Sequence, residues 1–429
     1  MDKAMPRATL SGVRTGIARH LENKRSFEGL ASRRSRRALD WVNFFVADVE
    51  EGFGGFVAFY LADLKWQQES VGLVLTASRI ASAIFLLAGG ALTDAVRWKR
   101  ALVAAGIVML AGAAVILALR PAFVSVLFAE ALQGAAAGIL TPAIAAISLG
   151  LVGRRAMSRR VGLNRRFNAA GSALTAALMG TLGSAFGKAA IFLTAAGLAL
   201  PALVALGFVR KDEIDYDRAR NAGKQDGRVT LQGFSVLFKN CQLLWFTCGV
   251  ALFQLANASM LVIAVEGMGR ANAAHSSLVT SAMILVPQII VALLAPSIGY
   301  FSELWGRKPV LVISFAAQIV RAALLGFVDD PILLIAVQML DGISGAVLTV
   351  MTTVIVADLT TGTGRFNLTS GVVGLVSAIA ASVSTAAFGF VAQEVGHQAA
   401  FLAMASIAAS GALVVWFLLG ETKPERYID

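Results

Sequence analysis

The strongest constraint on the fold is a succession of apolar runs, each about as long as a membrane-spanning helix. Of the 429 residues, 57% are hydrophobic and only 15% are charged, whereas soluble proteins carry roughly 25% charged residues. About 20 apolar residues span a bilayer as a helix, and these runs do not alternate as barrel strands do. We predict an all-α membrane protein with twelve transmembrane helices, near residues 39–61, 70–92, 101–119, 122–150, 167–186, 189–209, 241–265, 276–300, 309–328, 331–358, 368–391 and 398–420.

The distribution of basic residues predicts the orientation of these spans. Cytoplasmic loops of membrane proteins carry an excess of Lys and Arg. With the N-terminus inside, 31 of the 37 Lys and Arg residues fall in the tails, the linker and the inner loops, and four fall in outer loops. We therefore expect a multi-pass protein of the cytoplasmic (inner) membrane with both termini cytoplasmic. The net charge of +11 then reflects topology and not nucleic-acid binding, and the cluster RRSRR (33–37) can also rest on anionic lipid headgroups.

The two halves of the chain repeat at a constant spacing. LQGAAAGILT (132–141) matches LDGISGAVLT (340–349), and GKAAIFL (187–193) matches GHQAAFL (396–402), at offsets of 208 and 209. Such a repeat predicts two pseudo-symmetric six-helix bundles in parallel orientation. The predicted divisions are a basic cytoplasmic tail (1–38), an N-terminal bundle (39–209), a cytoplasmic linker (210–240), a C-terminal bundle (241–420) and a cytoplasmic C-tail (421–429).

Two loops at equivalent places in the halves carry a shared motif. The second has the pattern G-x-x-x-[DE]-x-x-G-R-K, and the first keeps part of it but has Arg97 and Trp98 where the pattern has Gly and Arg. Together with six plus six spans and a polar linker, this motif resembles the major facilitator superfamily over roughly residues 38 to 421. The motif residues are Gly299, Glu303, Gly306, Arg307 and Lys308 in the second half, and Gly90, Asp94 and Lys99 in the first.

The resemblance implies a secondary transporter that works by alternating access, in which these loops hold one conformational state. Arg365 is the expected partner of Glu303, and Arg154 or Arg155 that of Asp94. Two patterns typical of proton-coupled drug exporters of the family are incomplete. The fourth span has Glu130 where the family pattern has Arg, and residues 168–187 have glycines but no proline.

Ionisable residues inside a span are expensive and are candidates for function. Asp48 and Glu51 lie three residues apart in the first span, so they share a helix face, and Arg79 lies at a similar depth in the second span. We predict an ion-paired cluster of these three residues that exchanges a proton as the site opens to each side. A static pair that only fixes helix packing is the alternative.

Further candidates occupy the fourth, seventh, ninth and tenth spans. Asp341, and then Glu130 with Gln133, are the next proton or substrate candidates, against a packing role. Gln254 and Asn257 share a face and could hydrogen-bond a substrate or another helix. Arg321 lies in a span that is peripheral in the family, so a structural pair or a snorkelling residue is expected there. Glu50 is expected either to be protonated or to turn inward, and the sequence leaves both open.

The leading functional prediction is proton-coupled export of a small solute by a protein that acts as a monomer in the lipid bilayer. Uptake of a metabolite or metal cation stays open, and a membrane-embedded enzyme or transport-like sensor is disfavoured. The sequence has neither H-E-x-x-H nor a phosphate-binding loop, and no Cys/His cluster. We therefore expect no enzyme activity, no cofactor, no dedicated metal site and no nucleic-acid partner.

Overall fold

The computed structural model describes residues 31–47, 57, 60–61, 64–119, 122–187, 189–221, 240–271, 276–328 and 330–423. The long elements in these ranges are all helices. They are α2 (Arg33–Phe45), α5 (Gln68–Ala95), α6 (Lys99–Leu119), α7 (Phe123–Val152), α8 (Met157–Phe186), α9 (Ala189–Gly207), α10 (Tyr216–Arg220), α12 (Cys241–Asn257), α13 (Met260–Ala271), α14 (Ser276–Trp305), α15 (Arg307–Leu325), α16 (Pro331–Leu359), α17 (Phe366–Glu394) and α18 (His397–Leu418).

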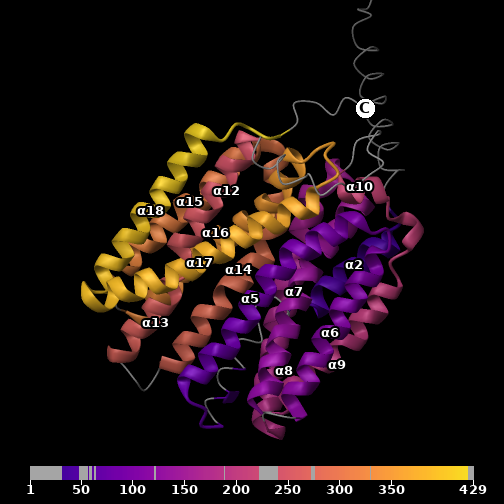
Figure 1. Ribbon diagram of the computed structural model, residues 1–429. Helices are drawn as coiled ribbons and strands as arrows, with labels where there is room; N and C mark the ends of the chain where they lie inside the picture. The colour runs from indigo at the N-terminus through magenta and orange to yellow at the C-terminus, as the bar shows by residue number, and fades with distance from the viewer. Residues whose placement is uncertain are drawn as a thin grey trace, which may run out of the picture.

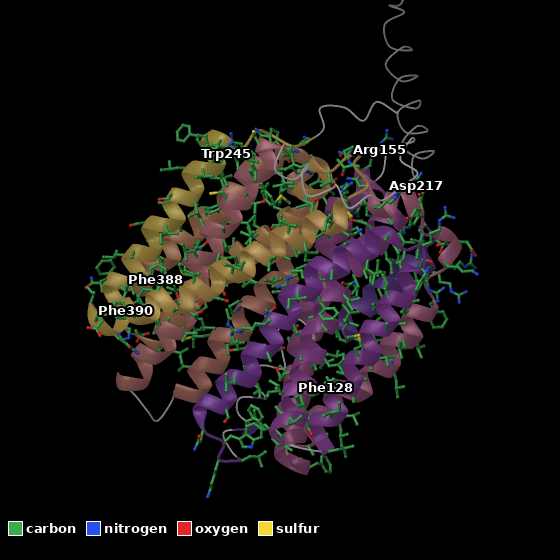
Figure 2. The ribbon with its side chains drawn as sticks, viewed as in Figure 1. Phe128, Arg155, Asp217, Trp245, Phe388 and Phe390 are labelled. Carbon is green, nitrogen blue, oxygen red and sulfur yellow. The ribbon has the colours of Figure 1, made fainter. Side chains whose placement is uncertain are left out.

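Ten stretches within the described ranges are helical, long and apolar enough to cross a membrane. Two of the twelve predicted spans are not among these ten. The span at 39–61 is only partly described, and 167–186 forms the greater part of α8, whose first turns carry several arginines. Large apolar side chains also cover the outside of the molecule, for example Phe128 and Phe390, which are 59% and 65% exposed (Figure 2). A surface of this kind is matched to lipid and not to water.

The helices form two bundles, one from each half of the chain (Figure 1). Helices α2 and α5 to α9, drawn in indigo to magenta, pack against one another, and α12 to α18, drawn in salmon to yellow, form the second group. Between the bundles, α5 packs on α17 and α8 packs on α14. These two contacts are equivalent under the repeat, so the interface has the same pseudo-symmetry as the sequence.

Small residues allow the closest packing within the first bundle, between α5 and α7. The segment GAAAG places Gly134 and Gly138 one turn apart on α7, in the G-x-x-x-G spacing of close helix pairs in membranes. A Cβ atom at Gly138 would lie 2.6 Å from the backbone nitrogen of Leu86, and one at Gly134 would overlap the carbonyl oxygen of Ser78. This approach buries Glu130, one turn before Gly134, beside α5.

The structure corrects the extent of the two motif loops, which were predicted at 93–100 and 301–308. Helix α5 continues to Ala95 and α6 begins at Lys99, whereas α14 and α15 are separated only by Gly306. Gly306 has a φ of 105°, which favours glycine. Asp94 and Glu303 therefore lie in last helical turns and not in loops. We call the end of the molecule that carries both connections the loop end; α10 lies there too, beside the labelled Arg155 and Asp217 (Figure 2).

Candidate functional site

A buried polar cluster joins three helices of the second bundle. Arg321 of α15 donates from Nη1 to Asp341 Oδ1 of α16 at 2.6 Å and to Asn257 Oδ1 of α12 at 2.7 Å. Its Nη2 donates to Gln338 Oε1 at 2.9 Å. We call these four residues the C-half cluster. The expectation of a structural pair at Arg321 agrees with this geometry, but the side chain points into the bundle and contacts two of the predicted candidates.

Exposure within the C-half cluster is asymmetric. Arg321 is 1% exposed, whereas the side chain of Asp341 is 25% exposed. Asn257 is half-buried, and Gln254 lies three residues before it on α12 with similar exposure. The carboxylate is thus the charged group of the cluster that can be reached from outside, and the guanidinium behind it holds it in place. Since α16 also packs on α8 of the first bundle, the cluster lies on a helix that borders the other half.

The first bundle carries a carboxyl group at its own α5–α7 contact. Glu130 is 1% exposed and hydrogen-bonds Ser78 of α5. Its Oε1 and the Oε1 of Gln133 have no hydrogen-bond partner in the described part of the chain. Both side chains therefore lie in the interior of the bundle, and their role as proton or substrate candidates stays a prediction.

The predicted cluster of the first span falls largely outside the described residues. Asp48 and Glu51 are not among them, and neither is Glu50. Arg79 is described and lies exposed on α5. The proposed pairing of these residues stays a prediction.

At the loop end, Asp94 binds the N-terminus of α17 in the other bundle. Its Oδ1 accepts from Asn367 Nδ2 at 2.7 Å and from the Asn367 backbone N–H at 3.3 Å. Its Oδ2 accepts from the Leu368 backbone N–H at 2.8 Å. The first N–H groups of a helix have no partner within it and carry partial positive charge, so a carboxylate is well matched to them. We call this contact the first clasp.

Glu303 makes the equivalent contact with α8. It accepts a hydrogen bond from the backbone N–H of Arg159, in the first turn of that helix, with Arg307 and Lys423 nearby. We call this the second clasp. The two motif glycines allow both approaches, because a Cβ atom at Gly90 would overlap the Asn367 carbonyl and one at Gly299 would overlap the Ser158 carbonyl.

The two carboxylates bind backbone N–H groups of the other bundle, which are different partners from the arginines that the resemblance implied. Arg365 is the N-cap residue of α17, next to the first clasp and not at Glu303. Arg154 instead lies 3.6 Å from Asp358 of α16. Asp358 also binds Arg307 at 3.1 Å, and both groups of that pair are buried.

The remaining motif residues have local roles. Arg307 also donates to the Ser302 carbonyl at 2.8 Å. The backbone N–H groups of Arg307 and Lys308 donate to Glu421, which thereby closes the start of α15 beside Gly306. Lys99 is buried and donates to the Thr93 carbonyl at 2.5 Å. Asp358 and Glu421 lie outside the motif, and only their charge near the loop end could have drawn attention to them.

The linker contributes a bridge that sequence reasoning missed. Tyr216 of α10 donates to the Asp94 and Ala95 carbonyls at 3.2 Å. Asn221, which follows α10 in a left-handed conformation, donates to the Ala357 carbonyl of the second bundle at 2.6 Å. The linker therefore contacts both bundles at the loop end. Nothing in its polar composition distinguished this short helix from the rest of the segment.

Upstream of α10, the linker also contacts the start of α2. Glu213 accepts from the Ser32 backbone N–H and hydroxyl at 3.0 and 2.9 Å. Burial alone would raise the pKa of Glu213, but hydrogen bonds from Ser35 and Ser32 and the nearby Arg210 hold it below its ordinary value.

The comparison with known proteins decides the family. A model of the Major Facilitator Superfamily matches residues 40–271 and again residues 248–428. The chain belongs to this superfamily. Two curated relatives, each described as an uncharacterized MFS-type transporter, come from Mycobacterium tuberculosis strains CDC 1551 and H37Rv; each is 35% identical over 392 residues, covering 91% of this chain and 94% of the relative.

Membership of the superfamily places the apolar helices in a membrane. The protein is an integral multi-pass membrane protein of a transporter family, and the all-α fold of two six-helix bundles is confirmed. Within the described ranges, no three His, Cys, Asp or Glu side chains gather closely enough to hold a metal ion.

Proposed function

We propose that the protein is a proton-coupled secondary transporter of a small solute, with Asp341 as a proton-binding group. The ion pair between Asp341 and Arg321 is the observation that carries this proposal. A charge pair inside a membrane bundle is costly and is retained where function requires it. The pair also contains a partly exposed carboxylate and a fully buried partner, an arrangement that suits exchange of a proton at the carboxylate alone.

The chemistry follows from the contacts of Arg321. When Asp341 binds a proton, the ion pair loses its negative member, but the guanidinium keeps its hydrogen bonds to Asn257 and Gln338. An uncompensated buried cation then favours either loss of the proton or binding of a solute that supplies an acceptor. Proton binding and solute binding at this place are thereby linked.

The two clasps supply the conformational part of the proposal. Both hold the bundles together at the loop end, so a solute site between the bundles would open toward the opposite end in this state. With both termini cytoplasmic and the protein in the inner membrane, as the basic residues favour, this state is outward-facing. Breaking the clasps and opening the loop end completes alternating access. We further propose that one chain suffices and that no enzyme activity accompanies transport.

Export is the proposed direction and rests on general family resemblance. Uptake of a metabolite or of a metal cation is the second candidate, favoured by the carboxyl groups of Asp341 and Glu130. The direction in which an imposed pH gradient drives solute separates the two, because the sign of the coupled flux shows whether proton and solute move together or oppositely.

Solute flux in proteoliposomes, with and without a pH gradient, tests the proposal with a panel that includes cationic dyes and divalent metals. Asp341→Asn should abolish the response to the gradient while solute binding persists. Asp330→Asn is the matched control, because Asp330 caps the same helix at an exposed place and Asn also caps well. Transport by Asp341→Asn that stays fully driven by the gradient would refute the role of Asp341.

A further inference from the structure

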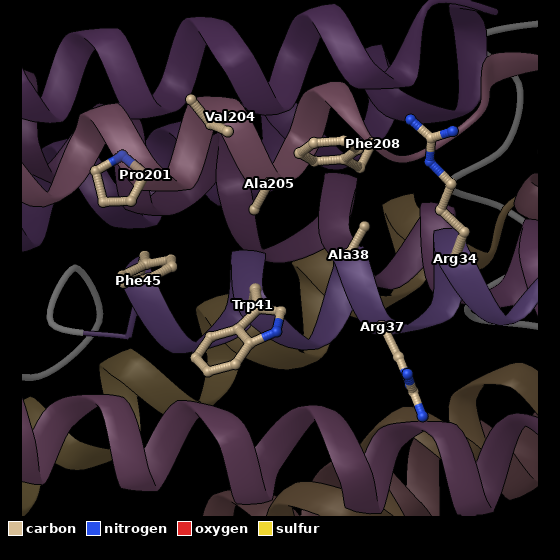
Figure 3. Close-up of a pocket in the computed structure, with 9 residues that line it drawn as sticks. All are labelled: Arg34, Arg37, Ala38, Trp41, Phe45, Pro201, Val204, Ala205 and Phe208. Atoms are coloured by element: carbon tan, nitrogen blue, oxygen red, sulfur yellow. The ribbon is translucent and has the colours of Figure 1, made fainter.

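A groove of about 520 Å³ runs along the outside of the first bundle between α2 and α9. Figure 3 shows that its two walls are single faces of these helices. Arg34, Arg37, Trp41 and Phe45 line it from α2, and Val204 and Phe208 line it from α9. We call this the α2–α9 groove. None of the contacts of the C-half cluster or of the clasps involves it.

Charge and apolar surface are segregated along the groove. Arg34 and Arg37 lie three residues apart on α2, at the loop end, and Trp41 and Phe45 follow toward the C-terminal end of the helix. From Arg34 to Phe45 the helix rises about 16 Å, at 1.5 Å per residue. This length equals about half of a 30 Å hydrocarbon core, the depth of one leaflet.

The two arginines have no carboxylate partner within the described part of the chain. Arg34 lies over the ring of Phe208, 4.9 Å from its centroid, which orients the guanidinium toward the groove. The neighbouring acidic residues are engaged elsewhere: Asp40 binds Arg160, and Glu213 binds Ser32 and Arg210. Two exposed cations from successive turns of α2, directed to either side of the apolar trough (Figure 3), therefore lack an anion in this part of the chain.

We propose that the α2–α9 groove binds one anionic phospholipid, with its headgroup at the end of the groove that carries Arg34 and Arg37 and an acyl chain along Trp41, Phe45 and Val204. The occupant is a lipid because the apolar walls face the bilayer, where Val204 is 62% exposed. It is anionic because a zwitterionic headgroup already neutralises its own phosphate, whereas phosphatidylglycerol brings an uncompensated charge to the two arginines. Placement of the loop end in the cytoplasm puts the groove in the leaflet where anionic lipids attract basic segments.

Titration of the purified full-length protein with phosphatidylglycerol, followed by native mass spectrometry, gives the affinity of the first bound lipid. Each arginine should contribute about fivefold, so Arg34→Gln with Arg37→Gln should weaken the first site by about 30-fold. Arg33→Gln is the matched control, because Arg33 is exposed on the same helix but does not line the groove. It makes the same change of charge and should leave the affinity within about twofold of wild type.

A further variant and two other ligands distinguish binding in the groove from general electrostatic attraction of anionic lipid to the protein. Val204→Trp keeps both arginines but fills the trough, and it should displace the lipid. Phosphatidylethanolamine should bind the wild-type protein no more tightly than it binds the double variant. Inorganic phosphate should not compete. The proposal is overturned if Arg33→Gln weakens binding as much as the double variant does. It is also overturned if Val204→Trp binds unchanged, or if inorganic phosphate alone displaces the lipid.

Discussion

Replacing Asp94 by Asn should open the loop end of the transporter. The change keeps the size of the side chain but removes the charge that faces the N-terminus of α17. Asp94 Oδ1 accepts two hydrogen bonds and Oδ2 one, all from Asn367 and Leu368. The amide oxygen of Asn can still accept the two hydrogen bonds from Asn367. The amide NH₂ group must then face the Leu368 N–H, and two hydrogen-bond donors oppose each other.

The size of this effect follows from two losses. An unsatisfied buried donor costs about 1–3 kcal/mol. Loss of a carboxylate from a helix N-terminus costs about 0.3–1 kcal/mol more. We therefore expect the closed loop end to lose about 3 kcal/mol relative to the open one, which is about a hundredfold change in their ratio at 1.4 kcal/mol per factor of ten.

Distances between spin labels across the loop end measure this ratio. Trp98 and Thr361 are exposed there in opposite halves, and labelling them as cysteines first requires replacement of the free Cys241 and Cys248. Asp94→Asn should add a population at longer distance, whereas the wild-type pair should give mainly the shorter one.

The control for this experiment is Asp217→Asn. Asp217 lies at the same end and is also a carboxylate, but it is 67% exposed, and its ion pair is with the neighbouring Arg220 of the same short helix. Its replacement should leave the distance distribution unchanged. Identical distributions for Asp94→Asn and wild type, or an equal shift in Asp217→Asn, would show that the first clasp does not hold the bundles together.

Three further predictions concern the same end of the molecule. Glu303→Gln should shift the label distances in the same sense by about 1–3 kcal/mol, additively with Asp94→Asn because the clasps are separate; full non-additivity would contradict this. Asp358→Ala leaves the buried Arg307 without its carboxylate and should lower the free energy of unfolding by about 3 kcal/mol, and a loss below about 1 kcal/mol in thermal unfolding would contradict this. Because the folded pKa of Glu213 is lowered, its contribution to stability is present above its ordinary pKa and lost as pH falls through the lowered value; Glu213→Gln should lack this part of the pH dependence of unfolding.

The repeat in the sequence predicted which residues of the two halves correspond, and the structure preserves that correspondence. Asp94 and Glu303 lie on equivalent last turns, and both contact the other bundle. Their partners were not predictable in the same way. Charged side chains can be read from a sequence and favour arginines as partners, whereas a backbone N–H group carries no residue-specific sign.

Arg321 shows a second limit of sequence reasoning. Its span is peripheral in the family, and this placement suggested a pair or a residue reaching for the membrane surface. Position along a span does not specify the direction of a long side chain, which here extends inward to Asn257 and Asp341 on two other helices. The sequence made Asn257 and Asp341 candidates because each is a polar residue within a span. Only the structure shows that one guanidinium binds both.

The use of helix N-termini at both clasps has a consequence for transport. A clasp must break in every cycle, and separation of a carboxylate from a helix end leaves one ion that water can solvate and a set of N–H groups that water can also satisfy. Separation of a buried ion pair leaves two desolvated charges, at a cost of about 3–5 kcal/mol for the unpaired member. Two clasps of about 2–3 kcal/mol each sum to about 5 kcal/mol, close to the 5.5 kcal/mol that converts a 1:99 equilibrium into 99:1. Binding of a proton and a solute with ordinary affinity can offset a free-energy difference of this size. The two clasps are therefore strong enough to favour one state and weak enough for the protein to leave it.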